Sequence, residues 1–346
     1  MNKQQSEQGM VSILVTMIMM IVITLIIIGI SQVTRSNQRE QLDQQLSTQA
    51  YYAAESGLNQ ATKFFATYPT ASINTIGNNG SSANCTQFIT NAAPNGLGGA
   101  NGVLDVNTKV SYTCLMVNST PTSLQKAPLT QDSNTVWRVQ DTGGQPFTQL
   151  DFKWSPNSTT QFTGGNDTCS AANFTAYGNW KCSFGILRVD LVDTHGTVPN
   201  STLEAPAKTI YMVPVYTVSG VTTPQAITGS VGQVIYVKCT AGSACDLKLT
   251  PSVASSEYYV RMTMMYQDSA SVQLSGTDAA GAAKFSGGQA VIDVTGKAQD
   301  QLRRVQARIP LTVSNSAMPI FALQSTDTLC KQLAVASGIA TVDSCP

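Results

Sequence analysis

The first strong pattern in the chain is an apolar run from Met10 to Ile30, and no charged residue lies between Glu7 and Arg35. As a helix this run is about 31 Å long, which matches a hydrocarbon core of roughly 30 Å. A helix also satisfies its own backbone hydrogen bonds in lipid. The run therefore predicts a membrane-spanning helix. Its expected membrane-facing side chains include Leu14, Ile18, Ile23, Leu25 and Ile28.

A second helical pattern follows the apolar run without a break. From Arg35 to Tyr68 there is no proline, and apolar or small residues recur every three or four positions, which places them on one helical face. Pro69 then supplies a stop signal. Residues 10–68 therefore predict one stem helix of about 88 Å, half in lipid and half packed on a globular domain. The expected packing face consists of Leu42, Leu46, Ala50, Ala54, Leu58, Ala61 and Phe65.

The rest of the chain is rich in strand signals. Short runs of β-branched and aromatic residues are separated by Gly, Pro, Asn and Ser, and strands do not alternate regularly with helices. A doubly wound nucleotide-binding sheet is therefore not expected. The predicted fold class is α+β, a long N-terminal helix followed by an antiparallel β-rich head. The expected strands are Val136–Val139, Gly185–Val192, Thr209–Val218, Val231–Lys238, Tyr258–Tyr266, Ala290–Val294 and Val305–Val313.

About 280 residues follow the stem, which is long for a single β-rich domain. The segment SGVTTPQAIT at 219–228 is polar and contains proline, so it is the expected boundary between two β-rich subdomains. The predicted organisation is a short leader in 1–9, the stem in 10–68, a first β-rich part in 69–220 and a second in 221–346.

All eight cysteines follow the stem. Their even number and the absence of C-x-x-C spacing predict disulfides formed in an oxidising compartment rather than zinc ligands. Eight cysteines allow 105 pairings, but proximity in sequence favours encounter between neighbours. The expected pairs are Cys85 with Cys114, Cys169 with Cys182, Cys239 with Cys245, and Cys330 with Cys345.

Catalytic and metal-binding patterns are missing from the sequence. His195 is the single histidine, so no H-E-x-x-H zinc pair exists, and neither a G-x-S-x-G elbow nor a Walker phosphate loop occurs. We therefore expect no enzymatic activity, no metal and no cofactor. Arg303, Arg304 and Arg308 could attract phosphate, but the formal net charge is zero and no broad basic run exists. Solvent-facing strand positions are the favoured interpretation, and nucleic-acid binding is not expected.

Three short motifs carry a family resemblance. Ser6–Gly9 (SEQG) precedes Met10, the apolar run follows, and Ala53–Leu58 reads AAESGL. In this order and spacing they resemble the start of type IV prepilins, specifically the X-type (PilX-like) minor pilins, over about the first sixty residues. The resemblance implies that a prepilin peptidase cleaves after Gly9 and methylates the new amino terminus at Met10. It also implies that the N-terminal helix contacts other pilins and an inner-membrane pilus assembly platform.

One position departs from the pilin pattern. Major pilins typically carry glutamate at the fifth mature position, where this chain has Leu14. In the family this carboxylate is thought to pair with the amino terminus of a neighbouring subunit. A subunit at the filament tip has no neighbour above it, so Leu14 favours a tip or initiating subunit. The resemblance thus implies a non-enzymatic minor subunit that primes assembly or sits at the tip, and the large head of such a subunit could present an adhesive surface.

The expected location is the cytoplasmic membrane, crossed once, with the head outside the cytoplasm and at the cell surface after pilus assembly. Lys3 lies on one side of the run and Arg35 and Arg39 on the other, so flanking charge does not set the orientation. The cysteines do, because disulfides need an oxidising space. The alternative is a permanently anchored surface binding module that keeps its leader and never polymerises.

Overall fold

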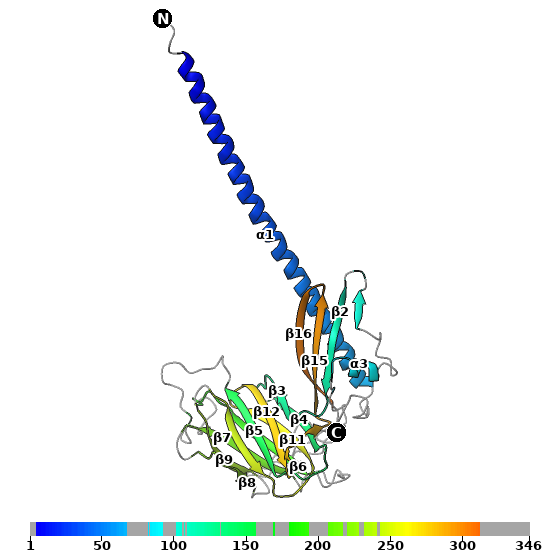
Figure 1. Cartoon of the computed structure of the whole chain (residues 1–346). Helices are drawn as coiled ribbons and strands as arrows, with labels where there is room; N and C mark the ends of the chain where they lie inside the picture. The colour runs from blue at the N-terminus through cyan, green and yellow to red at the C-terminus, as the bar shows by residue number, and fades with distance from the viewer. Residues whose placement is uncertain are drawn as a thin grey trace, which may run out of the picture. The chain divides into compact units, whose positions relative to one another are not determined.

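The computed structural model of the chain is drawn in Figure 1. It describes residues 5–67, 82, 84–92, 102–105, 107, 109–131, 133–156, 169, 180–193, 207–216, 220–227, 232–240 and 243–311. The described residues up to Asn118 and those of Val291–Ile309 form one compact unit, and those of Ser119–Ala290, with Pro310 and Leu311, form a second. The second unit is thus inserted into the sequence of the first. We call them the helix–sheet unit and the sandwich unit.

Helix α1 (Gln5–Thr67) has 63 residues and joins both helical patterns of the sequence in one element (Figure 1). Hydroxyl groups in its apolar half bond within the helix. Thr16 Oγ1 donates to the Ile13 carbonyl at 2.9 Å, and Thr24 Oγ1 donates to the Ile21 carbonyl at 2.8 Å. These side chains therefore keep hydrogen-bond partners even in a surrounding that offers none.

The helix–sheet unit also contains a four-stranded sheet with the order β1-β2-β15-β16. Strand β2 pairs antiparallel with β1 on one side and with β15 on the other. A two-residue turn at Gln299 and Asp300 connects β15 to β16, and Gln299 has a positive φ of 51° there. The elements are β1 (Val103–Asp105), β2 (Val110–Asn118), β15 (Gln289–Ala298), β16 (Gln301–Pro310) and the short helix α3 (Gln87–Ala92).

The sandwich unit consists of two six-stranded sheets. One has the order β13-β12-β5-β10-β8, with β3 also paired to β12, and the other has the order β14-β4-β11-β6-β7-β9. The strands are β3 (Ser123–Lys126), β4 (Asn134–Asp141), β5 (Gln149–Pro156), β6 (Ile186–Asp193), β7 (Ala207–Val215), β8 (Gln225–Ala226), β9 (Gln233–Lys238), β10 (Cys245–Thr250), β11 (Glu257–Met265), β12 (Ser269–Asp278), β13 (Gly281–Ala282) and β14 (Phe285–Ser286).

Alternate side chains of these strands point into one apolar core between the two sheets. In β5 the buried residues are Leu150, Phe152 and Trp154, and in β11 they include Val260 and Met262. All five belong to the same buried cluster. Because successive side chains of a strand point to opposite faces of its sheet, the buried residues of each sheet all lie on one face. The two apolar faces pack against each other and enclose the core.

Two strand pairs in the sandwich unit are parallel, so the head that was expected to be antiparallel contains mixed sheets. Strand β7 pairs parallel with β9, and β8 pairs parallel with β10. From β7 to β10 the chain alternates between the two sheets: β7 and β9 lie in one sheet, and β8 and β10 lie in the other. Within each sheet the second strand therefore runs in the same direction as the first. The coarse class is α+β, with one long apolar N-terminal helix and a β-rich remainder.

The expected boundary at 220/221 does not coincide with the division into two units. Strand β5 pairs with β10, and β7 pairs with β9, so both six-stranded sheets contain strands from either side of this position. The division instead falls at 118/119 and 290/291. Each of the seven expected strands overlaps a strand of the structure: β4, β6, β7, β9, β11, β15 and β16.

Disulfides link three pairs of cysteines in the described residues. The sequence separations are 29, 13 and 6 residues, and these pairs are the ones that proximity in sequence favoured. Cys330 and Cys345, the fourth expected pair, lie outside the described residues. The bonded pairs are Cys85–Cys114 in the helix–sheet unit and Cys169–Cys182 and Cys239–Cys245 in the sandwich unit.

Candidate membrane and assembly helix

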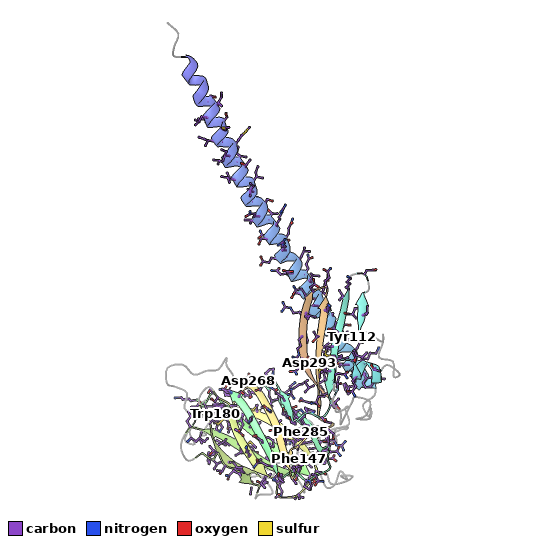
Figure 2. All side chains as sticks on the ribbon, in the orientation of Figure 1. Tyr112, Phe147, Trp180, Asp268, Phe285 and Asp293 are labelled. Atoms are coloured by element: carbon purple, nitrogen blue, oxygen red, sulfur yellow. A yellow bond between two sulfur atoms is a disulfide. The ribbon has the colours of Figure 1, made fainter. Side chains whose placement is uncertain are left out.

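The apolar half of α1 is uncovered in the chain. The five side chains expected to face the membrane are each between 52% and 63% exposed. Figure 2 shows the side chains of this half standing out around the helix. The helix is long and apolar enough to cross a bilayer. In water so much uncovered apolar surface would be unfavourable, so this half needs lipid or other apolar helices around it. The five residues are Leu14, Ile18, Ile23, Leu25 and Ile28.

The second half of α1 is packed on the sheet of the helix–sheet unit mainly through small residues. Its buried positions follow one another at three- and four-residue steps, which forms one face of the helix. At its end this face carries two aromatic side chains in place of small ones. The buried residues are Ala50, Ala53, Ala54, Gly57, Ala61, Phe64 and Phe65.

Two glycines allow the helix and the sheet to approach closely. A Cβ atom on Gly57 of α1 would lie 2.7 Å from Val294 Cγ1 and 3.0 Å from Tyr112 Cγ. A Cβ atom on Gly296 of β15 would overlap the backbone of α1, at 2.5 Å from the Ala54 nitrogen. Real Cβ atoms do not come so near to their neighbours, so no larger residue fits at Gly296 without moving the helix.

Hydrogen bonds fix the helix at two places along this contact. Tyr112 of β2 is almost fully buried, and its Oη lies 2.7 Å from Gln60 Oε1, to which it donates. Burial raises the pKa of Tyr112, which keeps the phenol protonated and able to donate. Between three and four turns earlier in α1, Arg303 Nε of β16 donates to Ser47 Oγ at 2.7 Å. These bonds define the helix position along the sheet.

An aromatic cluster and a disulfide hold the last turns of α1. The Phe64 and Phe88 rings meet edge to face with centroids 5.3 Å apart, and Phe65 stacks on Phe88 at 6.0 Å. Phe88 belongs to α3, which follows Cys85, and Cys85 is bonded to Cys114 of β2. The disulfide therefore ties α3, and with it the end of α1, to the sheet.

The expected packing face coincides with buried positions for part of its length. Ala50, Ala54, Ala61 and Phe65 are buried, and Leu46 and Leu58 are half-buried. Leu42, however, is 57% exposed and does not belong to the contact, because it lies more than one turn before Ser47, where α1 meets β16. Sequence reasoning missed Ala53, Gly57 and Phe64, although the short steps between them and the expected residues could have indicated a wider face.

The expected processing site lies near the start of α1. Gly9 and Met10 are helical, but their side chains lie outside what the structure describes. No group of three or more metal-ligating residues occurs among the described residues. Arg303 and Arg304 of β16 are engaged within the unit: Arg303 with Ser47, and Arg304, whose Nε donates to Asp293 Oδ1 at 2.7 Å. Among the described residues, α1 is therefore the candidate functional element.

Comparison with protein-family models, curated proteins and solved structures finds no match to this chain.

Proposed function

We propose that this chain is a non-enzymatic, single-pass, pilin-like minor subunit of a type IV pilus or a related filament. One observation carries the proposal: α1 is a single helix whose first half is uncovered and apolar, while its second half is packed on a small sheet. A subunit of this build can exchange lipid around its apolar half for the apolar helices of other subunits. Packing between such helices relies on van der Waals contacts, which lipid and protein both supply.

The proposed role is to prime assembly or to occupy the tip. Leu14 supports this role. It is the fifth residue counted from Met10, and it carries no carboxylate that could pair with a neighbouring subunit. The sandwich unit, as a large insertion in the helix–sheet unit, supplies a surface for adhesion. The partners in this proposal are other pilins, a prepilin peptidase and the inner-membrane assembly platform. The head lies outside the cytoplasmic membrane and reaches the cell surface with the pilus.

The mass of the intact protein, extracted from membranes, tests this proposal. A prepilin loses Met1–Gly9 and gains a methyl group on Met10, whereas a permanently anchored module keeps residues 1–9 and gains nothing. A chain that retains its leader in the native membrane would overturn the proposal.

A variant at the cleavage site sharpens the test. Gly9→Leu is expected to leave the leader uncut and to keep the chain out of sheared filament fractions, since a bulky side chain blocks the peptidase. Gly29→Ala is the matched control within the same helix, because an added Cβ there meets no atom within 4 Å. Normal processing of Gly9→Leu would contradict the prepilin interpretation.

A further inference from the structure

Charged residues of α1 just beyond the apolar run lie on an unexpected side of the helix. Asp43 precedes the buried Ala50 by seven residues, about two turns, and Arg39 precedes it by eleven, about three turns. Arg35 and Glu40 flank the same line. These charged residues therefore lie on the same side of α1 as Ala50, the side that packs on the sheet in the second half of the helix. In an ordinary surface helix they would occupy the opposite side.

The opposite side carries an uncharged stripe, which we call the amide stripe. Its six residues lie within an arc of about 80° at 3.6 residues per turn, and all are exposed. Amide side chains dominate it, and each amide both donates and accepts hydrogen bonds. The stripe consists of Gln38, Gln41, Gln45, Gln49, Tyr52 and Asn59.

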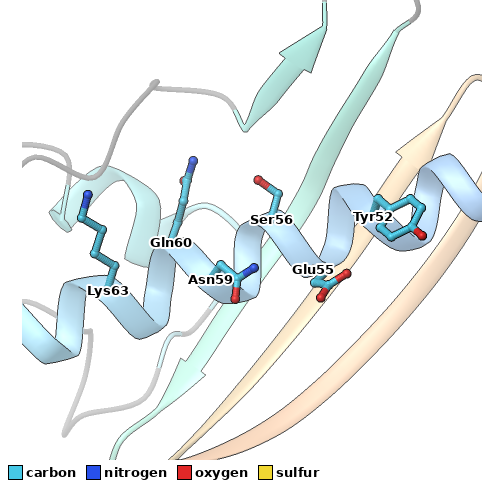
Figure 3. A pocket seen from close by; sticks show the side chains of 6 residues that line it. All are labelled: Tyr52, Glu55, Ser56, Asn59, Gln60 and Lys63. Atoms are coloured by element: carbon cyan, nitrogen blue, oxygen red, sulfur yellow. The ribbon is translucent and has the colours of Figure 1, made fainter.

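The stripe ends at a shallow hollow with an aromatic side chain at its rim (Figure 3). Tyr52 is 62% exposed and meets Tyr51 edge to face with ring centroids 5.9 Å apart. The hollow has a volume of 330 Å³ and is lined by side chains of α1, of which Glu55 and Lys63 are charged, so the uncharged stripe ends here. Exposed tyrosines beside a recess are common where proteins contact each other.

We infer that the amide stripe packs against the same stripe of a second copy of this chain, with the two stems parallel and in register. The apolar runs fix both stems in one membrane, in one direction and at one height. In such a pair each side chain meets its own counterpart. Like charges repel, which excludes the side that carries Arg35, Arg39, Glu40 and Asp43, whereas amides opposite amides form hydrogen bonds. The uncharged stripe is therefore the side on which identical stems fit.

This inference concerns the anchored stem and does not require removal of the leader. The pair forms in the membrane through residues beyond the apolar run, before or without entry into a filament. Its failure and the failure of the proposed function are therefore distinguishable in Gly9→Leu, the uncut variant: the stem contact persists there while processing is lost.

Cysteine cross-linking in native membranes tests the contact. Gln45→Cys, in the centre of the stripe, is expected to give about tenfold more disulfide-linked dimer under mild oxidation than Glu40→Cys, because paired stems hold the new thiols at high effective concentration. Glu40 is the matched control, since it is also exposed and lies on the charged side. The unsubstituted chain sets the background of its native cysteines. Equal dimer yields at both positions would overturn the inference.

A charge placed in the stripe provides the second measurement. In a Gln41→Cys chain, Gln45→Glu is expected to reduce the dimer to the level of the Glu40→Cys control, because two carboxylates would then face each other. Gln45→Asn keeps the amide and is expected to retain most of the dimer. Both substitutions lie at an exposed position away from the packed face, so the fold is retained. Unchanged cross-linking in Gln45→Glu would show that the stems meet elsewhere.

Discussion

The two units of the molecule achieve burial in opposite ways. In the helix–sheet unit, α1 approaches the sheet through alanines and glycines, so that backbone lies close to backbone at Gly296 and Ala50. In the sandwich unit, large side chains such as Phe152, Trp154 and Phe184 fill the space between two sheets and are completely buried. The contact between α1 and the sheet has no room for added atoms. The stability of the sandwich core, in contrast, depends on the large side chains that fill it.

This difference predicts opposite responses to a change in side-chain volume. Added atoms strain the helix–sheet contact, because the backbone on either side cannot move without shifting the whole helix. Removed atoms leave a cavity in the sandwich core, because the two sheets cannot fully collapse around it. Trp137, Trp154 and Trp180, the three tryptophans of the chain, all belong to the sandwich unit. Tryptophan fluorescence therefore follows the unfolding of the sandwich unit selectively.

The largest effect is expected for Phe152→Ala in the sandwich core. Loss of a fully buried phenyl ring costs about 4 kcal/mol of unfolding free energy, the sum of lost transfer energy and a new cavity. Urea unfolding of the full chain in detergent, followed by tryptophan fluorescence, measures it. Phe152→Leu, which keeps most of the volume, should cost about 1 kcal/mol. Equal losses in the two variants would contradict the account of this core as tightly filled.

The next effect is expected for Gly296→Ala in the sheet of the helix–sheet unit. The new Cβ overlaps the backbone of α1 near Ala50, so we expect a loss of about 3 kcal/mol, at the upper end for overpacking. Protease digestion of the stem should become faster, while the tryptophan transition of the sandwich unit stays unchanged. A stem as resistant as in the unsubstituted chain would show that the close approach is not required.

Much of the local structure was predictable from the sequence because it depends on short-range patterns. The apolar run and the three- and four-residue steps of Ala50, Ala54, Leu58 and Ala61 predicted α1, which the structure forms as one element. The same pattern did not predict that Gly57 belongs to the packed face. Gly57 contributes no apolar side chain, so a pattern of apolar residues passes over it, although its missing Cβ is what lets Val294 come close.

The long-range arrangement was not predictable from local pattern. Strands β2 and β15 are neighbours in one sheet, although nearly the whole sandwich unit lies between them in the sequence. No local property of Asn118 or Val291 predicts that these two residues pair. Likewise, the β-branched residues of β7 and β9 predict strands but not which of two sheets each joins, and that choice makes the pair parallel. For this reason the expected boundary near residue 220 differs from the division into two units.

A smaller effect separates two glycines of α1. Gly57→Ala should lose about 1 kcal/mol in the helix–sheet unit, since Val294 and Tyr112 are side chains that can shift part of the way. Gly29→Ala gains helix propensity and meets no neighbour, so the unfolding of both units should stay unchanged. Protease resistance of the stem measures both. A loss at Gly29 equal to that at Gly57 would attribute the effect to the helix itself rather than to its contact with the sheet.

The smallest effect concerns charge rather than volume, on the sandwich unit. Burial and the neighbouring Asp246 carboxyl raise the pKa of Asp151 to about 7, although Lys153 and Lys248 oppose the shift. The Lys153 Nζ lies 3.3 Å from Asp246 Oδ2 and 3.8 Å from Asp151 Oδ2. The Oδ1 atoms of both carboxyls are buried and accept no hydrogen bond in the described part of the chain. A proton on Asp151 therefore relieves the repulsion between the two groups.

The sign of the pH dependence follows from this raised pKa. The folded chain binds the proton of Asp151 more tightly than the unfolded chain, whose pKa is near 3.8, so the stabilisation is complete at low pH and is lost as the pH rises towards about 7. Asp151→Asn cannot lose a proton. Because water screens this half-buried carboxyl and reduces the full effect of the shift, its Tm should fall by only about 2 °C less than that of the unsubstituted chain between pH 5 and pH 8. Asp300→Asn, in the exposed turn before β16, is the control and should behave like the unsubstituted chain. Identical pH profiles for Asp151→Asn and the unsubstituted chain would mean that Asp151 stays ionised in the folded state.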